Sequence, residues 1–138
     1  LLVMGDGLTE LKKALTKEGI VYVGAQSNVV PYMQAMDAYC LPSLTETTSL
    51  SVLEAMSCGL PVVSTKVGFI KDYIEPGKTG LFFEKHNAFM LFKLLQKLHK
   101  DAALRKKLGK NARALVEKKF SWKSTSKQLL EILEAISK

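Results

Sequence analysis

Residues 41 to 65, with the sequence LPSLTETTSLSVLEAMSCGLPVVST, decide the fold of this chain. Short apolar runs at residues 37–41 and 60–64 flank a polar loop and a helical stretch, and Pro42 stops the first run. A helix that joins two buried strands is the crossover from which parallel sheets are built. The stretch therefore predicts an α/β domain.

The helix of this crossover carries its own start and stop signals. Thr48 or Ser49 can cap its amino end, and Gly59 followed by Pro61 ends it near residue 58. The loop at residues 43–48 then lies beyond the carboxyl end of the first strand, which is where ligands bind in such sheets. We expect this loop to form part of a binding site.

Two glutamates, Glu46 in the loop and Glu54 in the second helical turn, flank the amino end of the helix. The free N–H groups and the positive dipole end of a helix suit a phosphate. A phosphate between two carboxylates indicates a sugar nucleotide, whose hydroxyls donate hydrogen bonds to both acids. The structural alternative is that Glu46 is an exposed turn residue and Glu54 a surface residue. Because apolar residues surround Glu54, we expect a helix packed on both sides, in which this acid needs a partner.

The rest of the chain extends the α/β pattern. Apolar runs predict further strands at residues 1–4, 20–23 and 81–83, and residues 76–80 predict a turn. Helical periodicity predicts helices at residues 8–18, 29–36 and 69–74, and again from residue 87 to the end. We expect one domain over residues 1–138, with the helices of about residues 87–138 packed on the sheet or extending from it.

The pattern Pro-Ser-x-x-Glu-x7-Glu-Ala-Met-x-Cys-Gly-x-Pro-Val-Val occupies residues 42–63. It resembles the signature of the retaining GT-B glycosyltransferases of the glycogen-synthase-like kind, often called family 4. Residues 2–7, 23–24, 37–38, 77–81 and 120–122 also match the family in order and spacing. The resemblance covers nearly the whole chain. It implies the C-terminal, donor-binding domain of such an enzyme, with a Rossmann-like parallel sheet and flanking helices. Because the chain opens inside a strand without a methionine, we expect this domain to be truncated at its amino end.

The resemblance also implies roles for the residues around the helix. Glu46 matches the family residue that contacts the donor sugar near the reacting carbon, and is the catalytic candidate. Glu54 matches the residue that binds the ribose hydroxyls. Backbone N–H groups of Ser49 and Leu50, together with the hydroxyls of Thr48 and Ser49, are the candidates for binding the diphosphate.

Three further donor-binding candidates, Gly24, Ala25 and Gln26, match the family segment that lies against the nucleobase. The sequence departs from the family at two places, and the first of them affects close backbone approach and hence the pose of the donor sugar. Residues 47–49 are Thr-Thr-Ser where the family often has Gly-Phe-Gly. Phe69 replaces the second glycine of a common Gly pair that begins at Gly68.

The implied reaction moves a hexosyl-type sugar from a nucleoside diphosphate sugar to an acceptor hydroxyl, with retention of configuration, in polysaccharide or glycoconjugate biosynthesis. In the family an Arg and a Lys upstream share the charge of the diphosphate, and a separate N-terminal domain binds the sugar, glycan or lipid-linked acceptor. Both would precede Leu1, so we expect this piece alone to be inactive. Two alternatives are a nucleotide-sugar epimerase of the same fold and a non-catalytic nucleotide-sugar-binding module.

Composition excludes several other classes of protein. Cys40 and Cys58 have no spacing typical of a metal site, and we expect both to be reduced core residues. No Asp-x-Asp pair is present, so we expect neither a metal nor another cofactor. No apolar run approaches the roughly 20 residues that span a bilayer, and no signal peptide is recognisable, so we expect a cytoplasmic protein.

The net charge of +7 is concentrated in the C-terminal helices. Residues 85–127 contain 13 Lys or Arg against two acids. The simplest interpretation is a solvated basic surface, and the alternative is weak peripheral contact with the inner face of a membrane. Aromatic residues do not alternate with these charges as in a base-stacking platform, so we expect no nucleic acid partner.

Overall fold

A computed structural model describes residues 1–6, 13 and 15–137 of the chain. The chain divides into two compact units, Leu1–Met36 and Asp37–Lys138, which are described separately. Among the described helices none is long and apolar enough to cross a membrane.

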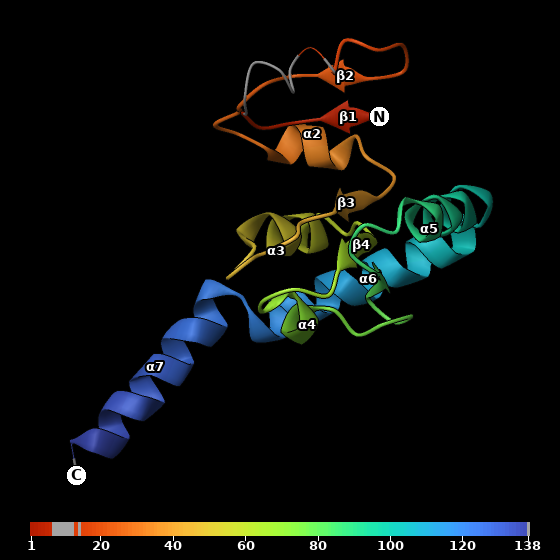
Figure 1. Ribbon diagram of the computed structural model, residues 1–138. Helices are drawn as coiled ribbons and strands as arrows, with labels where there is room; N and C mark the ends of the chain where they lie inside the picture. The colour runs from red at the N-terminus through yellow and green to blue at the C-terminus, as the bar shows by residue number, and fades with distance from the viewer. Residues whose placement is uncertain (7–12, 14, 138) are drawn as a thin grey trace. The chain divides into compact units, whose positions relative to one another are not determined.

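The described residues of the first unit form a two-stranded parallel sheet and the helix α2 (Figure 1). Strand β1 (Leu2–Val3) pairs with β2 (Val21–Tyr22), and helix α2 spans Val30–Gln34 with a proline in its first turn. Both predicted strands and the predicted short helix are confirmed. The helix predicted for residues 8–18 falls largely on residues 7–12 and 14, outside the described residues.

The second unit is built on a three-stranded parallel sheet in the order β3-β4-β5. The strands are β3 (Tyr39–Leu41), β4 (Val62–Thr65) and β5 (Gly80–Phe83). Helix α3 (Leu50–Ser57) connects β3 to β4, and the short helix α4 (Ile70–Tyr73) lies between β4 and β5. The predicted crossover is therefore confirmed, with the strand after it shifted two residues toward its carboxyl end.

Three longer helices complete this unit: α5 (Ala88–Lys100), α6 (Ala102–Lys119) and α7 (Trp122–Ile136). Each begins at a side-chain cap. Asn87 accepts a hydrogen bond from the Met90 N–H at 2.8 Å, Asp101 from the Leu104 N–H at 2.8 Å, and Ser121 from the Ser124 N–H at 3.2 Å. The helical C-terminal region is thus confirmed, with polar residues dividing it into three helices.

The core of the second unit lies between the sheet and helices α5 and α6. Val63, Phe83, Leu98 and Leu108 form its buried centre. Helix α7 contributes no buried residue, and its Trp122 is 89% exposed. The apolar periodicity of the last helix therefore predicted its conformation but not a place in the core.

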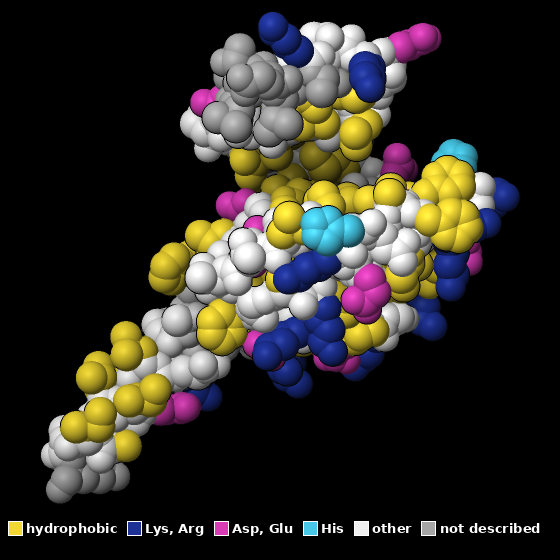
Figure 2. All heavy atoms as spheres, in the orientation of Figure 1, with side chains coloured by type: hydrophobic (Ala, Val, Ile, Leu, Met, Phe, Trp, Pro, Cys, Tyr) yellow, Lys and Arg dark blue, Asp and Glu magenta, His cyan; other side chains and the backbone are white. Residues whose placement is uncertain are grey.

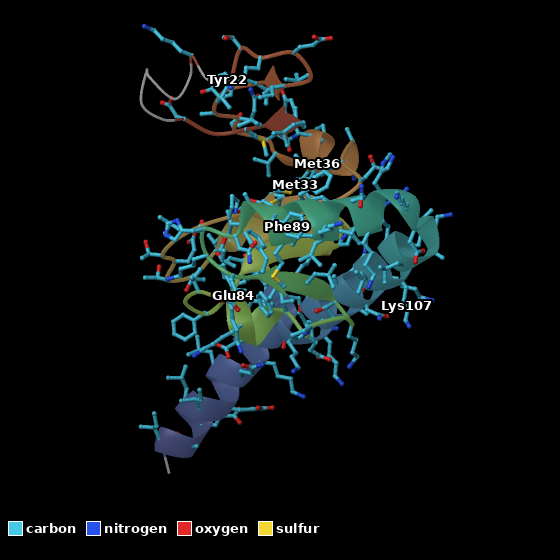
Figure 3. The ribbon with its side chains drawn as sticks, turned by 45° about the vertical axis from the view of Figure 1, so that its right-hand side comes forward. Tyr22, Met33, Met36, Glu84, Phe89 and Lys107 are labelled. Atoms are coloured by element: carbon cyan, nitrogen blue, oxygen red, sulfur yellow. The ribbon has the colours of Figure 1, made fainter. Side chains whose placement is uncertain are left out.

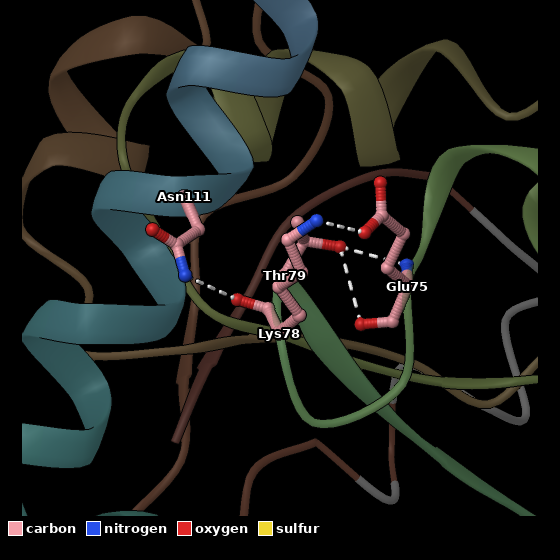
Figure 4. Close-up of polar contacts among 4 residues, drawn as sticks. All are labelled: Glu75, Lys78, Thr79 and Asn111. Atoms are coloured by element: carbon pink, nitrogen blue, oxygen red, sulfur yellow. Dashed lines mark hydrogen bonds and ion pairs between the residues drawn. The ribbon is translucent and has the colours of Figure 1, made fainter.

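A hydrogen-bonded turn holds the amino end of β5 (Figure 4). The buried Thr79 hydroxyl accepts from the Glu75 N–H at 2.8 Å, and the Asn111 amide donates to the Lys78 carbonyl at 2.9 Å. Lys78 pairs with the Glu75 carboxylate at 2.6 Å and lowers the pKa of Glu75. The turn predicted at residues 76–80 is confirmed, and Asn111 ties it to α6.

Helices α3 and α6 approach closely at two glycines. A Cβ atom on Gly109 of α6 would clash with the backbone carbonyl oxygen of Gly59, just beyond α3. The atoms that it would meet belong to the backbone of Gly59 and Leu60, so no flexible side chain can yield to relieve this clash. The contact therefore fixes α6 against the end of α3, the helix that follows the polar loop.

Gly109→Ala is expected to destabilise the fold by about 1 to 3 kcal/mol, because overpacking forces backbone shifts. Alanine at an ordinary helical position would instead stabilise by roughly 0.5 to 1 kcal/mol relative to glycine. Urea unfolding should therefore show a lower midpoint, whereas Lys110→Ala at the neighbouring exposed position should leave the midpoint nearly unchanged. A stabilised Gly109→Ala variant would show that the two helices do not pack as described.

Candidate functional site

The polar loop of residues 42–49 leaves the carboxyl end of β3 and is anchored to the neighbouring strand β4. Ser64 Oγ donates a hydrogen bond to the Leu41 carbonyl at 3.0 Å, and Thr65 Oγ1 donates to the Ser43 carbonyl. Ser64 and Thr65 are both buried. The first residues of the loop are therefore held by the carboxyl ends of two adjacent strands, which is the expected place for a ligand site.

Glu46 is half-buried, and one of its oxygens is already held. Ser43 Oγ donates to Glu46 Oε1 at 2.8 Å. The following residue, Thr47, accepts a hydrogen bond from the Phe69 N–H at 3.0 Å. The side chain and the backbone at this point of the loop are therefore both fixed, and Glu46 presents its carboxylate in a defined orientation.

Gly68 packs against the backbone of this loop. Its φ of 52° lies in the left-handed region, and a Cβ atom would clash with the Glu46 carbonyl oxygen and lie 2.7 Å from the Thr47 carbonyl oxygen. Both the conformation and the close approach require glycine here. The first position of the family's Gly pair thus has a structural reason in this chain, and Phe69 at the second position contributes its N–H to the same loop.

The amino end of α3 has no side-chain cap. Ser49 occupies the N-cap position with φ −93° and ψ 97°, but its hydroxyl accepts no bond from the first turn. The prediction that Ser49 or Thr48 caps the helix through its side chain is wrong, because Ser49 Oγ hydrogen-bonds with Ser51 Oγ at 3.1 Å instead. The first-turn N–H groups therefore remain without a side-chain acceptor, and an anion can take that place.

Glu54 is exposed, which corrects the expectation of a helix packed on both sides. Helix α3 buries one face through Val52, Ala55 and Met56, and Glu54 lies on the other. No described residue forms an ion pair with Glu54. Because the sequence around Glu54 is apolar on both sides, it indicated burial, but only the helical position determines which face a residue takes. An exposed carboxylate at this position is accessible to a ligand.

Tyr39, the first residue of β3, interacts with Ser51 of α3 and was not among the predicted site residues. Burial raises the pKa of Tyr39, a hydrogen bond with Ser51 lowers it, and the negative charges of Glu54 and Glu46 raise it further. Tyr39 therefore adds a hydroxyl group beside Ser51 in the first turn of α3. The available signal was its strand position, three residues before the Pro-Ser pair.

The other donor-binding candidates belong to the Leu1–Met36 unit. Gly24 has a φ of 68° and accepts a hydrogen bond from the Gly5 N–H at 2.9 Å. Gln26 donates to the Val23 carbonyl and accepts from the Tyr32 hydroxyl at 3.0 Å. Gly24 and Gln26 thus have local structural roles, and the binding role of residues 24–26 stays a prediction.

The family model "Glycosyl transferases group 1" matches residues 1–115 of the chain. The chain belongs to this family. N-acetyl-alpha-D-glucosaminyl L-malate synthase of Bacillus anthracis is 32% identical to this glycosyltransferase chain over 126 residues, which is 87% of the chain and 33% of that relative.

Two solved structures share the fold of the group 1 glycosyltransferase chain. Sucrose-phosphate synthase from Thermosynechococcus elongatus superposes with a TM-score of 0.88 at 25% identity, covering 98% of this chain and 38% of that one. Anabaena HepE in complex with UDP has a TM-score of 0.88 at 24% identity, covering 97% and 40%. The GT-B fold and its Rossmann-like α/β half are thereby confirmed. The chain spans between a third and two fifths of the length of these proteins.

The two cysteines of this glycosyltransferase chain are free, as predicted, although both are partly exposed. Burial raises the pKa of Cys40 to about 11, so its thiol stays protonated at neutral pH and is a poor nucleophile. Among the described residues no group of His, Cys, Asp and Glu could hold a metal ion. The chemical groups that the site offers are therefore carboxylates, hydroxyls and backbone N–H groups.

Proposed function

We propose that this chain is the donor-binding part of a glycosyltransferase that uses a nucleoside diphosphate sugar and retains the anomeric configuration. The observation that supports this most strongly is the uncapped amino end of α3, which stands in the chain between a loop carboxylate held by a hydrogen bond, Glu46, and an exposed helix carboxylate, Glu54. The amino end of α3 suits an anion, and the two carboxylates suit sugar hydroxyls. A sugar nucleotide contains both kinds of group.

The diphosphate of the donor would bind at the start of α3. Backbone N–H groups of Ser49 and Leu50 need no particular side chain for this contact, and the exposed Thr48 hydroxyl adds a donor. The positive end of the helix dipole would stabilise the charge that develops on the leaving diphosphate, which is an electrostatic role that requires no metal.

The two glutamates would bind different parts of the donor. The exposed Glu54 would accept hydrogen bonds from the ribose, which does not change during the reaction. Ser43 holds Oε1 of Glu46. The lone pairs of the Glu46 carboxylate that Ser43 leaves free would contact the transferred hexosyl group near its reacting carbon. The hydrogen bond between Tyr39 and Ser51 would hold both hydroxyl groups in place beside the start of α3.

The ligands and activities of similar proteins support this type of donor. HepE has been solved with UDP and with UDP-glucose, and two other similar proteins are a sucrose-phosphate synthase and an N-acetylglucosaminyl malate synthase. We infer a sugar, glycan or lipid-linked acceptor, bound mainly by a part of the protein outside this chain. The product would belong to polysaccharide or glycoconjugate biosynthesis.

A thermal-shift screen of the full-length protein with the common nucleoside diphosphates tests the proposal. A ligand at 100 times its dissociation constant should stabilise the protein by about 2.7 kcal/mol. The sugar donors of the stabilising nucleotide should then be consumed only in the presence of an acceptor, and NMR of the product should show the anomer of the donor.

Two results would contradict the proposal in different ways. Conversion of the donor sugar without any acceptor would indicate an epimerase. Nucleotide binding without turnover of any donor over a broad acceptor panel would indicate a binding module. If no nucleoside diphosphate stabilised the protein, the proposed donor class itself would be wrong.

A further inference from the structure

The outer face of helix α5 exposes two phenylalanines. Phe89 is 71% exposed and Phe92 is 56% exposed, although the opposite face of the same helix packs Leu98 into the core. Figure 3 labels Phe89 on this helix. Positions 89 and 92 lie on the side of the helix away from Leu98, so neither ring belongs to the face that packs into the core. Two neighbouring exposed rings on one face indicate a contact surface.

Four lysines lie on α5 or next to it, and the nearest acids in the sequence are Glu84 before Lys85 and Asp101 after Lys100. Lys85, Lys93, Lys97 and Lys100 are all exposed, and the sequence contains no Asp or Glu between Lys85 and Lys100. Among the described residues none of these four lysines forms an ion pair. Figure 2 shows dark blue side chains gathered over the part of this unit that holds α5 and α6.

The rings and the charges occur together on the same surface. The Lys93 ammonium lies 5.3 Å from the centroid of the Phe89 ring, which is a cation–π distance. Asp101, the first acid after the helix, is already used as the cap of α6. The surface therefore presents aromatic groups beside an excess of positive charge, with four lysines against the exposed Glu84.

We propose that this α5 surface, made of Phe89, Phe92 and the four lysines, docks on an anionic lipid membrane. Phenylalanine rings insert at the boundary between headgroups and acyl chains, while lysine stems reach back to the anionic headgroups. Each lysine near such a surface adds about fivefold in affinity at low salt. This inference is independent of the proposed chemistry at Glu46 and Glu54.

Other occupants suit this surface less well. A second copy of the chain placed on the same face would bring two sets of four lysines together, and like charges repel. Lysine is also depleted in protein–protein interfaces, where aromatic residues are enriched. An anionic lipid layer favours both kinds of residue.

Helix α7 provides a contrast. It also exposes apolar residues, among them Trp122 and Ile136. Its two lysines, Lys123 and Lys127, are balanced by Glu131 and Glu134. The charges of helix α7 therefore do not favour an anionic membrane, whereas those of the α5 surface do.

Sedimentation of the full-length protein with lipid vesicles tests the proposal. We expect binding to vesicles that contain phosphatidylglycerol but not to pure phosphatidylcholine, and weaker binding as salt rises from about 0.1 M to about 0.5 M. Replacing Phe89 and Phe92 together by serine should weaken binding roughly 100-fold, at about tenfold for each ring. Replacing Lys93 and Lys97 by glutamine should weaken it roughly 25-fold at low salt.

A matched control separates this surface from net charge. Lys110→Gln with Lys118→Gln removes the same two charges from exposed positions of α6 and should change vesicle binding by less than about threefold. An equal loss in this control, or no binding of the parent to anionic vesicles, would overturn the proposal. A dimer that the serine variant dissociates, without an effect on vesicle binding, would assign the surface to a second copy instead.

Discussion

Gly68→Ala in the full-length protein is expected to lower kcat/KM by about 100-fold or more. A Cβ atom at this position would clash with the Glu46 carbonyl oxygen and lie 2.7 Å from that of Thr47, so the loop must move. A displacement of about 1 Å at a catalytic group can cost roughly 100-fold in rate. Because the loop lies outside the β3-β4-β5 ladder, the sheet should stay folded, and the circular dichroism spectrum should be retained.

Gly77→Ala is the matched control for this variant. Gly77 also has a positive φ, of 74°, but a Cβ atom there would meet nothing within 4 Å. Both substitutions therefore introduce backbone strain of about 1 to 3 kcal/mol, and only Gly68→Ala adds the clash with the loop. Equal activities of the two variants would show that the loop around Glu46 does not need its observed position.

Glu46→Gln is expected to lower kcat and kcat/KM together by about ten- to a hundredfold, with little change in KM. If Glu46 lies beside the reacting sugar, its charge matters most in the transition state, where charge and geometry change. A hydrogen bond to a charged group contributes roughly 1.5 to 3 kcal/mol. Steady-state kinetics with saturating acceptor measure both constants.

The same change at Glu84, an exposed acid after β5, provides the control and should leave the kinetics unchanged. Glutamine at position 46 retains an oxygen that can accept from Ser43, so the loop should be preserved. A Glu46→Gln enzyme that lost affinity for the donor but kept kcat would assign Glu46 to ground-state binding.

The crossover around α3 could be predicted from the sequence because its signals are local. Apolar runs, Pro42, Gly59 and Pro61 each act within a few residues, and they located β3, α3 and β4 to within about two residues. The three caps that divide the C-terminal helices are of the same local kind. Glu46 was predicted to lie in the loop beyond β3, and it does.

Most of the errors concern contacts between segments that are distant in the sequence, and one, the cap of α3, is local. Apolar neighbours indicated a buried Glu54, yet α3 buries only one face against the rest of the unit. The hydroxyl of Ser49 was expected to cap the helix and pairs with Ser51 instead. The close approach of Gly68 to the carbonyl oxygens of Glu46 and Thr47 depends on the placement of two separate segments. No pattern within a single segment shows which other segment it will contact.

Exposure of apolar residues was also not predictable from periodicity. The positions of Phe89 and Phe92 fit a helix, but their outward direction follows from how α5 packs on the sheet. The same holds for α7, whose apolar residues all stay at least partly exposed. Tertiary packing decides which side of a helix is covered.

Calorimetric titration of the Glu54→Ala variant with the nucleoside diphosphate of the donor tests the central claim most directly. The account predicts that binding weakens about ten- to a hundredfold relative to the parent, because the ribose loses roughly 1.5 to 3 kcal/mol of hydrogen bonding to a charged group. Glu134→Ala, on the exposed helix α7, should bind as the parent does. If folded Glu54→Ala bound the nucleotide as tightly as the parent, the amino end of α3 with its two carboxylates would not be the donor site.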